Sequence, residues 1–261
     1  MKLHRITAVM LRYFLLYPAS LGRLIDIFYW PMRDIVMWGL TSVWAFKTQP
    51  DNEKLLFAML TGVVLWQLVL RSNTSTGLSI FEDIVSQNVL NMVFTPLTLA
   101  EWIVGIMAMS GILALSAFVF SFVAAKLLFG INIFSVGIVL VPLIVILLLF
   151  GWSLGFFGAS CVLYGGTKGL SFIYIISWSF APFVGIFYPL SVLPAWCITV
   201  SKCIPASYVF EQLRSISLQG TYAMNQLLLA FLLSCAYLAV ALTIFTQIFK
   251  RRKMRGLAQL H

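Results

Sequence analysis

The chain is poor in charged residues, and acidic residues are the scarcest: 8 of 261 residues are Asp or Glu, and charged residues together make up 10%. Soluble domains average about 25% charged residues, so this composition excludes an ordinary soluble protein. Hydrophobic residues instead account for 61% of the chain, and the mean hydropathy is +1.00. Long apolar segments in lipid must satisfy their own backbone hydrogen bonds, which helices do. The sequence therefore predicts an all-α integral membrane protein.

Side chains that carry enzyme or metal chemistry are also scarce. The two histidines lie near the ends of the chain, at His4 and His261, and the four cysteines have no metal-ligand spacing. Cys197 and Cys203 lie close enough in sequence either to form a disulfide or to remain free. The turn at residues 164–169 lacks the Gly-Lys-Ser/Thr pattern of a phosphate-binding loop. We therefore expect no catalytic, metal-binding or cofactor-binding residue in this chain, and no ATP site.

Six apolar segments follow one another along the chain, and each approaches the roughly 20 residues that a helix needs to cross the hydrocarbon core. They belong to a single predicted transmembrane domain, residues 1–261. The predicted spans are residues 30–46, 55–76, 101–128, 135–163, 170–188 and 224–249.

Basic residues set the predicted orientation. The net charge is +9, and the basic residues cluster before the first span and after the last one. Cytoplasmic flanks carry an excess of lysine and arginine, so both termini are predicted to be cytoplasmic, and nucleic-acid binding is not suggested. The clusters are Lys2, Arg5, Arg12 and Arg23 at one end, and Lys250, Arg251, Arg252, Lys253 and Arg255 at the other.

Residues 1–23 form the first of two predicted amphipathic segments. Lys2, Arg5 and Arg12 fall on one helical face, and apolar residues cover the rest, which is typical of a helix in the membrane interface. It can be an elbow that braces the first span or a simple basic anchor, and the short segment that follows it favours the elbow. Arg33 and Asp34, in the first turn of span one, are interpreted as a pair at headgroup level.

Residues 80–94 form the second amphipathic segment, predicted to be a separate helix on the cytoplasmic side. A helix that only lies on anionic lipid would carry basic residues, whereas this one has two acids and no basic residue. Docking on a protein partner is therefore favoured over simple contact with lipid. The polar face consists of Glu82, Asp83, Ser86 and Gln87, and the apolar face includes Phe81, Ile84, Val85, Val89 and Met92.

Three other features concern the spans. Arg71 either reaches the inner interface or helps to hold an inner gate. Thr98 and Glu101 match a capping box at the start of span three. A ridge of small residues in span four lets another helix approach closely, either within one subunit or between two. The ridge consists of Gly151, Gly155 and Ala159.

Residues 189–215 separate the last two spans. Pro189, Pro194 and Pro205 exclude one straight helix, and the aromatic side chains here would be costly to leave in water. Irregular backbone at membrane depth needs cover from protein or a cavity. We therefore predict an outer re-entrant segment, which either plugs the exit of a path or forms an inert cap. The predicted outer gate consists of Tyr188, Pro189, Pro194, Trp196, Tyr208, Glu211 and Arg214.

Four short motifs occur in order here: Phe187-Tyr188-Pro189, Leu193-Pro194, Pro205-Ala206-Ser207-Tyr208 and Glu211-Gln212-Leu213-Arg214. Their order before the last span resembles the end of the ABC type-2 exporter permeases, and chain length and span order are similar too. The resemblance implies the membrane subunit of an ATP-driven exporter in the bacterial inner membrane. Its substrate would be amphipathic or lipid-linked: a glycolipid, a polysaccharide or a drug.

The same resemblance implies partners and roles. Two permease copies, as a homodimer, would assemble with two copies of an ATPase subunit, which binds ATP and Mg²⁺. Residues 80–94 would be the coupling helix, and Arg71 and Glu101 would be candidates for an inner gate. The implied ATPase contact consists of Phe81, Glu82, Asp83, Ser86 and Gln87.

Two other classes remain as alternatives. An ion-coupled secondary transporter usually has ionisable residues near the membrane midplane, and spans three to six contain almost none. A membrane enzyme would need a cluster of reactive side chains at one end of the spans, and the sequence contains no such cluster. The exporter permease is therefore the leading prediction.

Overall fold

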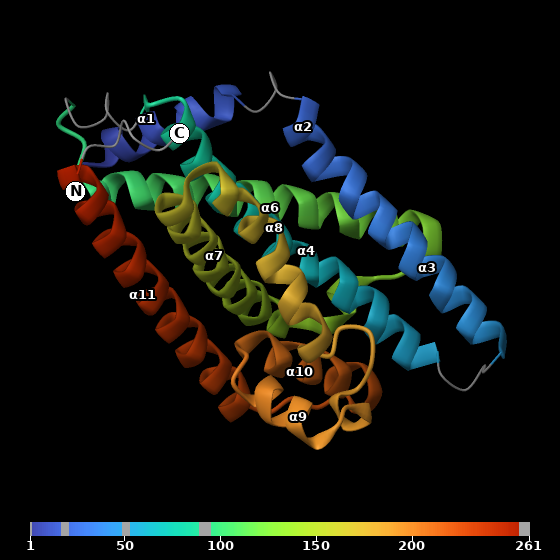
Figure 1. Ribbon diagram of the computed structural model, residues 1–261. Helices are drawn as coiled ribbons and strands as arrows, with labels where there is room; N and C mark the ends of the chain where they lie inside the picture. The colour runs from blue at the N-terminus through green and yellow to red at the C-terminus, as the bar shows by residue number, and fades with distance from the viewer. Residues whose placement is uncertain (1, 17–20, 49–52, 89–94, 256–261) are drawn as a thin grey trace.

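The computed structural model describes residues 2–16, 21–48, 53–88 and 95–255, and within these ranges the chain forms helices and turns without a β-strand. α1 lies at one end of the molecule together with the last residues of α11, while α9 and α10 lie at the opposite end (Figure 1). The main helices are α1 (Leu3–Leu16), α2 (Leu21–Leu24), α3 (Trp30–Thr48), α4 (Glu53–Val85), α6 (Leu99–Phe129), α7 (Leu140–Gly165), α8 (Leu170–Phe180), α9 (Ala195–Lys202), α10 (Pro205–Gln219) and α11 (Met224–Arg255).

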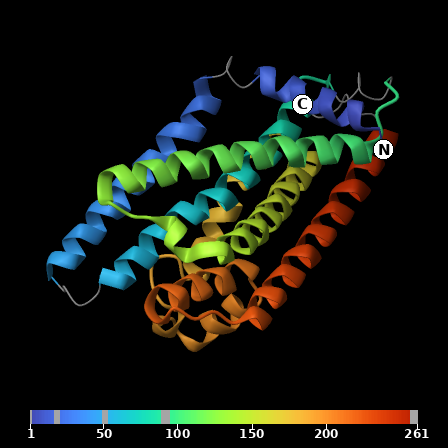
Figure 2. The same ribbon diagram turned by 180° about the vertical axis from the view of Figure 1, so that it is seen from behind.

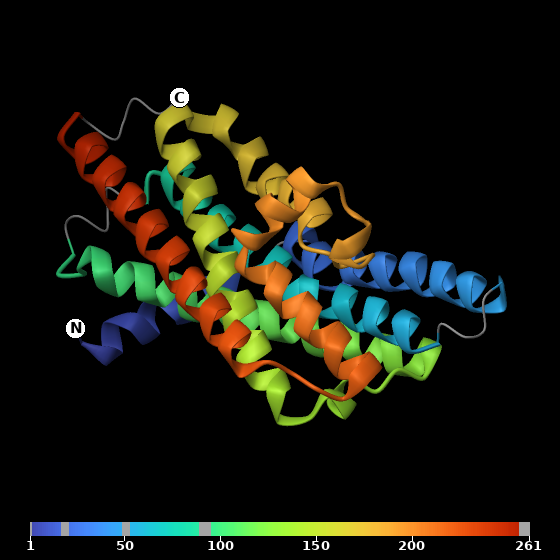
Figure 3. The same ribbon diagram turned by 90° about the horizontal axis from the view of Figure 1, so that it is seen from below.

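α7 is the central helix of the bundle. It packs along both α4 and α11, and α8 returns beside it after a short 3-10 turn. α11 runs alongside α7 in the view from below (Figure 3), and α6 crosses obliquely over the back of the bundle (Figure 2). α7 is highly apolar along its length, which suits a helix covered by neighbours on several sides.

Three helical segments of the described chain are long and apolar enough to cross a membrane: Leu99–Phe129, Ile133–Gly165 and Met224–Arg252. A fourth is possible if Leu3–Leu16 and Leu21–Trp44, which are bent by 97° relative to each other, count as one span. The prediction of an all-helical membrane protein is therefore confirmed, with three to four helices capable of crossing.

α4 differs from the prediction. Residues 80–85 continue α4 without a break, so they do not begin a separate helix, and residues 89–94 of the predicted coupling helix lie outside the described residues. The predicted boundary lay at residues 77–79, directly after the Ser- and Thr-rich stretch that follows Arg71. These hydroxyls are buried and bonded, for example Thr74 Oγ1 to the Leu70 carbonyl at 2.8 Å and Thr76 Oγ1 to Ser110 Oγ at 3.0 Å, so the helix continues through them.

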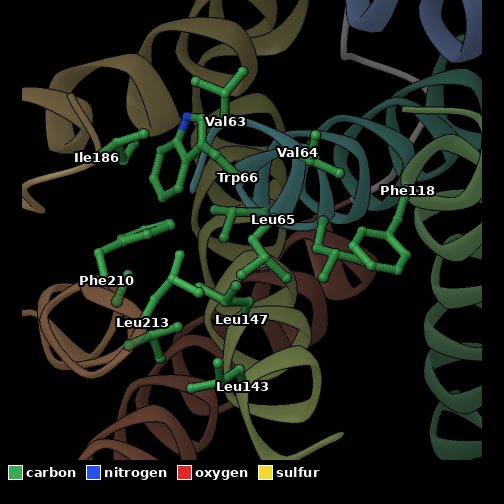
Figure 4. Packing of buried hydrophobic residues seen from close by; sticks show 14 of the residues in the cluster. Val63, Val64, Leu65, Trp66, Phe118, Leu143, Leu147, Ile186, Phe210 and Leu213 are labelled. Atoms are coloured by element: carbon green, nitrogen blue, oxygen red, sulfur yellow. The ribbon is translucent and has the colours of Figure 1, made fainter. Parts of the chain in front are cut away.

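Two hydrophobic cores lie along the bundle. The core nearer to α9 and α10 includes Trp66 of α4, Leu147 of α7 and Phe210 of α10, which converge in Figure 4. The core nearer to α1 includes Trp102 of α6 and Phe245 of α11. The polar stretch of α4 lies between the two.

The small-residue ridge of α7 packs against α4. A Cβ atom on Gly155 would lie 2.7 Å from Thr76 Cβ and 2.9 Å from the backbone oxygen of Asn73, and one on Gly151 would lie 3.0 Å from the Val69 carbonyl oxygen. Both helices belong to the same chain. Of the two interpretations, the structure therefore supports packing within one subunit.

The start of α3 also differs from the prediction. α2, the π-helical turn Ile25–Tyr29 and α3 follow one another without a gap, so residues 21–23 belong to this helix and not to the interfacial one. Pro31 cannot donate a backbone hydrogen bond, and its ring crowds the carbonyl four residues earlier. A wider π-helical turn before it accommodates this crowding. Asp34 therefore does not lie at a free helix N-terminus.

Candidate functional site

A carboxylate at the end of α4 holds α1 in place. Asp83 is 1% exposed, and it accepts hydrogen bonds from Arg12 and Tyr13 of α1 and, at 3.2 Å, from Trp102 Nε1 of α6. Burial and the neighbouring carboxylate raise the pKa of Tyr13, so its hydroxyl stays protonated and donates. We call these four residues the α1 lock.

Glu101 makes a second connection to α1. Its side chain and that of Thr98 form the predicted capping box at the start of α6, which is confirmed. The same carboxylate also accepts from the backbone N–H of Lys2 at 2.8 Å and lies 3.4 Å from Arg5 Nη1. Glu101 is therefore engaged in capping α6 and in holding α1.

The orientation of α1 follows from these contacts. Its basic side chains Arg5 and Arg12 face acids of the protein, whereas the sequence assigned them to the membrane surface. Its outward side is apolar instead, with Leu11, Phe14 and Leu15 all exposed. An apolar outward side and a bend of 97° to the next helix are features of a helix that lies along a membrane surface.

Of the predicted ATPase contact, only the tip of α4 is open. Asp83 is buried in the α1 lock, and Glu82 forms an ion pair with Arg23. Phe81 packs against the core nearer to α1. Ser86 and Gln87 are exposed, and the hydroxyl of Ser86 bonds within its own helix, to the carbonyl of Glu82 at 2.6 Å. Asp83 is therefore corrected from a docking residue to an internal one.

Arg71 lies in the middle of α4 and is buried. Its Nη1 donates to the backbone carbonyl of Asp26 at 2.6 Å and lies 3.4 Å from the Asp26 carboxylate. The prediction that Arg71 reaches the inner interface is therefore replaced by an internal ion pair with the segment before α3.

A second charged pair meets α4 one helical turn from Arg71, at Gln67. Arg33 Nε donates to Asp34 Oδ1 at 3.0 Å, and Gln67 Nε2 of α4 donates to Asp34 Oδ2 at 3.0 Å. The predicted Arg33–Asp34 pair is confirmed as a contact. Asp34 is 3% exposed and faces α4, whereas the Arg33 side chain is 39% exposed.

At the opposite end, α9 and α10 close the bundle (Figure 1). α10 buries Val209, Phe210 and Leu213 against α4, α7 and α11. Side chains satisfy much of the irregular backbone here, as Ser201 Oγ bonds the Phe183 carbonyl at 2.5 Å and Tyr188 Oη bonds the Pro182 carbonyl at 2.6 Å. The broken backbone is thus held by neighbouring protein, as its composition requires.

Arg214 is the main connection between α10 and the broken end of α8. Its Nη2 donates to the carbonyls of Gly185 at 2.8 Å and Tyr188 at 3.0 Å. Burial lowers the pKa of Arg214 and Glu211 opposes this, but a guanidinium remains charged at neutral pH. The expected Glu211–Arg214 pair is not among the ion pairs of the described residues, because backbone carbonyls take up the guanidinium.

The predicted outer gate is therefore brought together in part. Tyr188 and Arg214 meet, and Pro189 and Pro194 flank the short 3-10 turn Leu190–Val192. The Tyr208 hydroxyl donates to the Lys202 carbonyl at 2.8 Å, whereas the Tyr188 hydroxyl donates to the Pro182 carbonyl. Trp196 is 64% exposed, so it lies on the surface and not inside a plug.

All four cysteines are free, so Cys197 and Cys203 form no disulfide.

Replacing Arg214 by methionine is expected to loosen this end of the molecule selectively. Two carbonyls lose a charged donor, and such a bond contributes about 1.5–3 kcal/mol. Hydrogen–deuterium exchange should rise in residues 183–192 and stay unchanged around the α1 lock. Glu211→Gln serves as the control, because its neighbour Arg214 stays on the backbone; equal exchange in both variants would contradict the role of Arg214.

Sequence reasoning missed the acceptors and donors that meet across helices, namely Tyr13, Trp102, Asp26 and Gln67. One signal was available in the sequence. Only 8 residues are acidic, and an acid that lies inside an apolar segment needs a charged or hydrogen-bonding partner. The partners lie far apart in sequence, 71 residues for Arg12 and Asp83 and 99 residues for Lys2 and Glu101, so spacing along the chain does not identify them.

No protein-family model and no curated protein matches this chain. The described residues form a helical bundle with α1 held by Asp83 at one end, a broken segment held by Arg214 at the other, and paired charges between them.

Proposed function

We propose that the chain is the transmembrane permease subunit of an ATP-driven exporter of the ABC type-2 kind, in a bacterial inner membrane. It would move an amphipathic or lipid-linked substrate outward: a glycolipid, a polysaccharide or a drug. The observation that carries the proposal is the Pro-broken segment from Phe187 to Arg214, which includes α9 and most of α10. It packs into the bundle at the end opposite α1 and contains the four motifs in order.

The proposed assembly contains two copies of this chain, as a homodimer, and two ATPase subunits that bind ATP and Mg²⁺. Ser86 and Gln87 at the tip of α4 are the described residues open to an ATPase. The α1 lock supports a role for α1 as an elbow, because it ties the helix on the membrane surface to that tip. At the other end, Tyr188 and Arg214 would hold the outer gate closed.

Six spans with both termini in the cytoplasm are part of this proposal. The arrangement has a direct test in Cys203, which is exposed at the α9–α10 end. With the other three cysteines replaced by serine or alanine, an impermeant maleimide should label Cys203 in intact cells. A cysteine at Lys168, which is also exposed but lies between α7 and α8 at the opposite end, should react only after permeabilisation. The reverse pattern would overturn the topology.

ATP coupling is tested on the tagged chain purified in mild detergent with its bound subunits. We expect an ATPase to co-purify and to hydrolyse ATP at a rate that depends on the permease. Ser86→Lys together with Gln87→Lys should lower this rate several-fold with the permease still folded, because neither side chain supports the tertiary fold. If this double variant kept the full permease-stimulated ATPase activity, that result would count against docking at this tip. Charge reversal at Glu82 and Asp83 is unsuitable, because it would break internal pairs.

An ion-coupled secondary transporter is the second candidate, and the partly buried pairs Arg71–Asp26 and Arg33–Asp34 favour it. Buried charges inside a membrane bundle are costly and often functional. The two candidates differ in their energy source. Transport in vesicles that stops on ATP depletion but not on collapse of ion gradients supports the exporter, and the opposite result supports ion coupling.

A further inference from the structure

A pocket of about 280 Å³ opens between α3, α4 and α8. Three aromatic side chains form its rim: Trp30, Tyr174 and Trp178, each 37–45% exposed. Small-molecule sites span about 300–1,000 Å³, so this pocket is at the small end of the range. It has room for one polar ring of a ligand and not for a complete drug-sized molecule.

Beneath the aromatic rim the pocket is polar. Arg33, Asp34, Asp26 and Arg71 all line it, and each arginine lies against one of the two acids. The four formal charges sum to zero. The guanidinium of Arg33 also lies 4.5 Å from the ring centroid of Trp30, so one face of that ring is already covered.

Asn73 supplies an acceptor with no partner among the described residues. It is 0% exposed and lines the pocket. Its Nδ2 donates to the Ile173 carbonyl at 2.7 Å, which fixes the amide, while its Oδ1 makes no hydrogen bond with the described residues. A buried acceptor without a donor is destabilising, so a donor on a ligand would be bound favourably here.

The arrangement discriminates between ligand chemistries. A phosphate would meet two carboxylates, and both arginines already face those carboxylates, so no net positive charge is left for it. A hydroxyl group can accept from a guanidinium and donate to a carboxylate or to Asn73 without breaking either pair. Tyr174 and Trp178 offer aromatic surface on which the apolar face of a ring can pack.

We infer that this pocket binds a neutral, hydroxyl-rich ring, that is, a sugar head group of an amphipathic molecule. The inference rests on the proposed function, and it selects a glycolipid-like head group from the substrates proposed there. Exposed apolar side chains of α3, including Met37 and Leu40, continue from the rim and suit the apolar tail of the same molecule. The pocket lies on the part of the bundle between α1 and the middle of α4, where a substrate arriving from the inner leaflet would meet it.

The test uses the full chain in lipid nanodiscs without ATPase or nucleotide. Radiolabelled dodecyl maltoside and dodecyl phosphate share one tail and differ in the head group, and binding is corrected with empty nanodiscs. We expect saturable binding of the maltoside, at least tenfold tighter than that of the phosphate. Trp178→Leu should weaken maltoside binding at least tenfold, and Trp44→Leu, an exposed tryptophan of α3 outside the pocket, should not change it.

Each other outcome overturns the inference. Equal binding of both probes would indicate tail contact alone, and tighter binding of the phosphate would indicate an anion site. Maltoside binding that survives Trp178→Leu with a normally folded protein would place the head group elsewhere. Because the assay contains no nucleotide, its failure leaves the ATPase experiment unaffected, and the two proposals can fail separately.

Discussion

Replacing Gly155 by leucine is expected to abolish the folded protein. A single Cβ at this position would already lie 2.7 Å from Thr76 Cβ and 2.9 Å from the Asn73 backbone oxygen, and a leucine adds three more carbons. Overpacking a core typically costs about 1–3 kcal/mol and occasionally more. Here a backbone atom blocks the space, so α4 and α7 would have to separate along the seam that joins the two hydrophobic cores.

The measurement is the yield of monodisperse protein after detergent extraction, together with its thermal midpoint. Gly155→Ala should fold with a midpoint lowered by several degrees, and Gly155→Leu should give little or no monodisperse protein. Gly165→Ala on the same helix is the matched control, since a Cβ there meets nothing within 4 Å. If Gly155→Leu were produced as well as this control, the close approach of α4 and α7 would be wrong.

Replacing Asp83 by alanine is expected to have the second largest effect. The carboxylate is buried and bonded to three side chains of the α1 lock, so its loss leaves Arg12 and Tyr13 without their acceptor. Breaking a buried, hydrogen-bonded charge pair costs about 3–5 kcal/mol. At about 2–4 °C per kcal/mol for a chain of this size class, the thermal midpoint should fall by roughly 10 °C.

Glu82→Gln provides the comparison, because Glu82 is adjacent but its side chain is 41% exposed. A partly exposed pair contributes about 0–1 kcal/mol, so this variant should remain within a few degrees of the wild type. Limited proteolysis adds a local measurement: Asp83→Ala should release α1 before the rest of the bundle is cut. A similar midpoint for both variants would show that Asp83 is not buried as described.

Composition was sufficient to predict the class of fold. Long apolar runs with almost no charge predict membrane helices, and α6, α7 and α11 follow the predicted spans within a few residues. The capping box at Thr98 was also predictable, because both partners lie within four residues of each other. Local signals of this kind depend only on neighbours in sequence.

The arrangement of the charged residues was not predictable in the same way. Arg71 and Asp83 are both charged residues of α4, and sequence reasoning places such residues toward water or lipid headgroups. In the structure Asp83 faces α1 and Arg71 faces the segment before α3, which return to α4 from 71 and 45 residues away. Which polar face meets another helix depends on tertiary packing, and a single sequence does not contain that information in its periodicity.

The unbroken length of α4 has a mechanical consequence. At 33 residues and 1.5 Å per residue it is a rod of about 50 Å, with its tip next to Ser86 and with Trp66 in contact with Phe210 of α10. Its close packing on Gly151 and Gly155 makes α7 the fulcrum about halfway along. A tilt of roughly 5° about that fulcrum would displace each end of α4 by about 2 Å in opposite directions. The contact with α10 lies nearer to the fulcrum, so a push at the tip would arrive there as an opposing shift of about 1 Å.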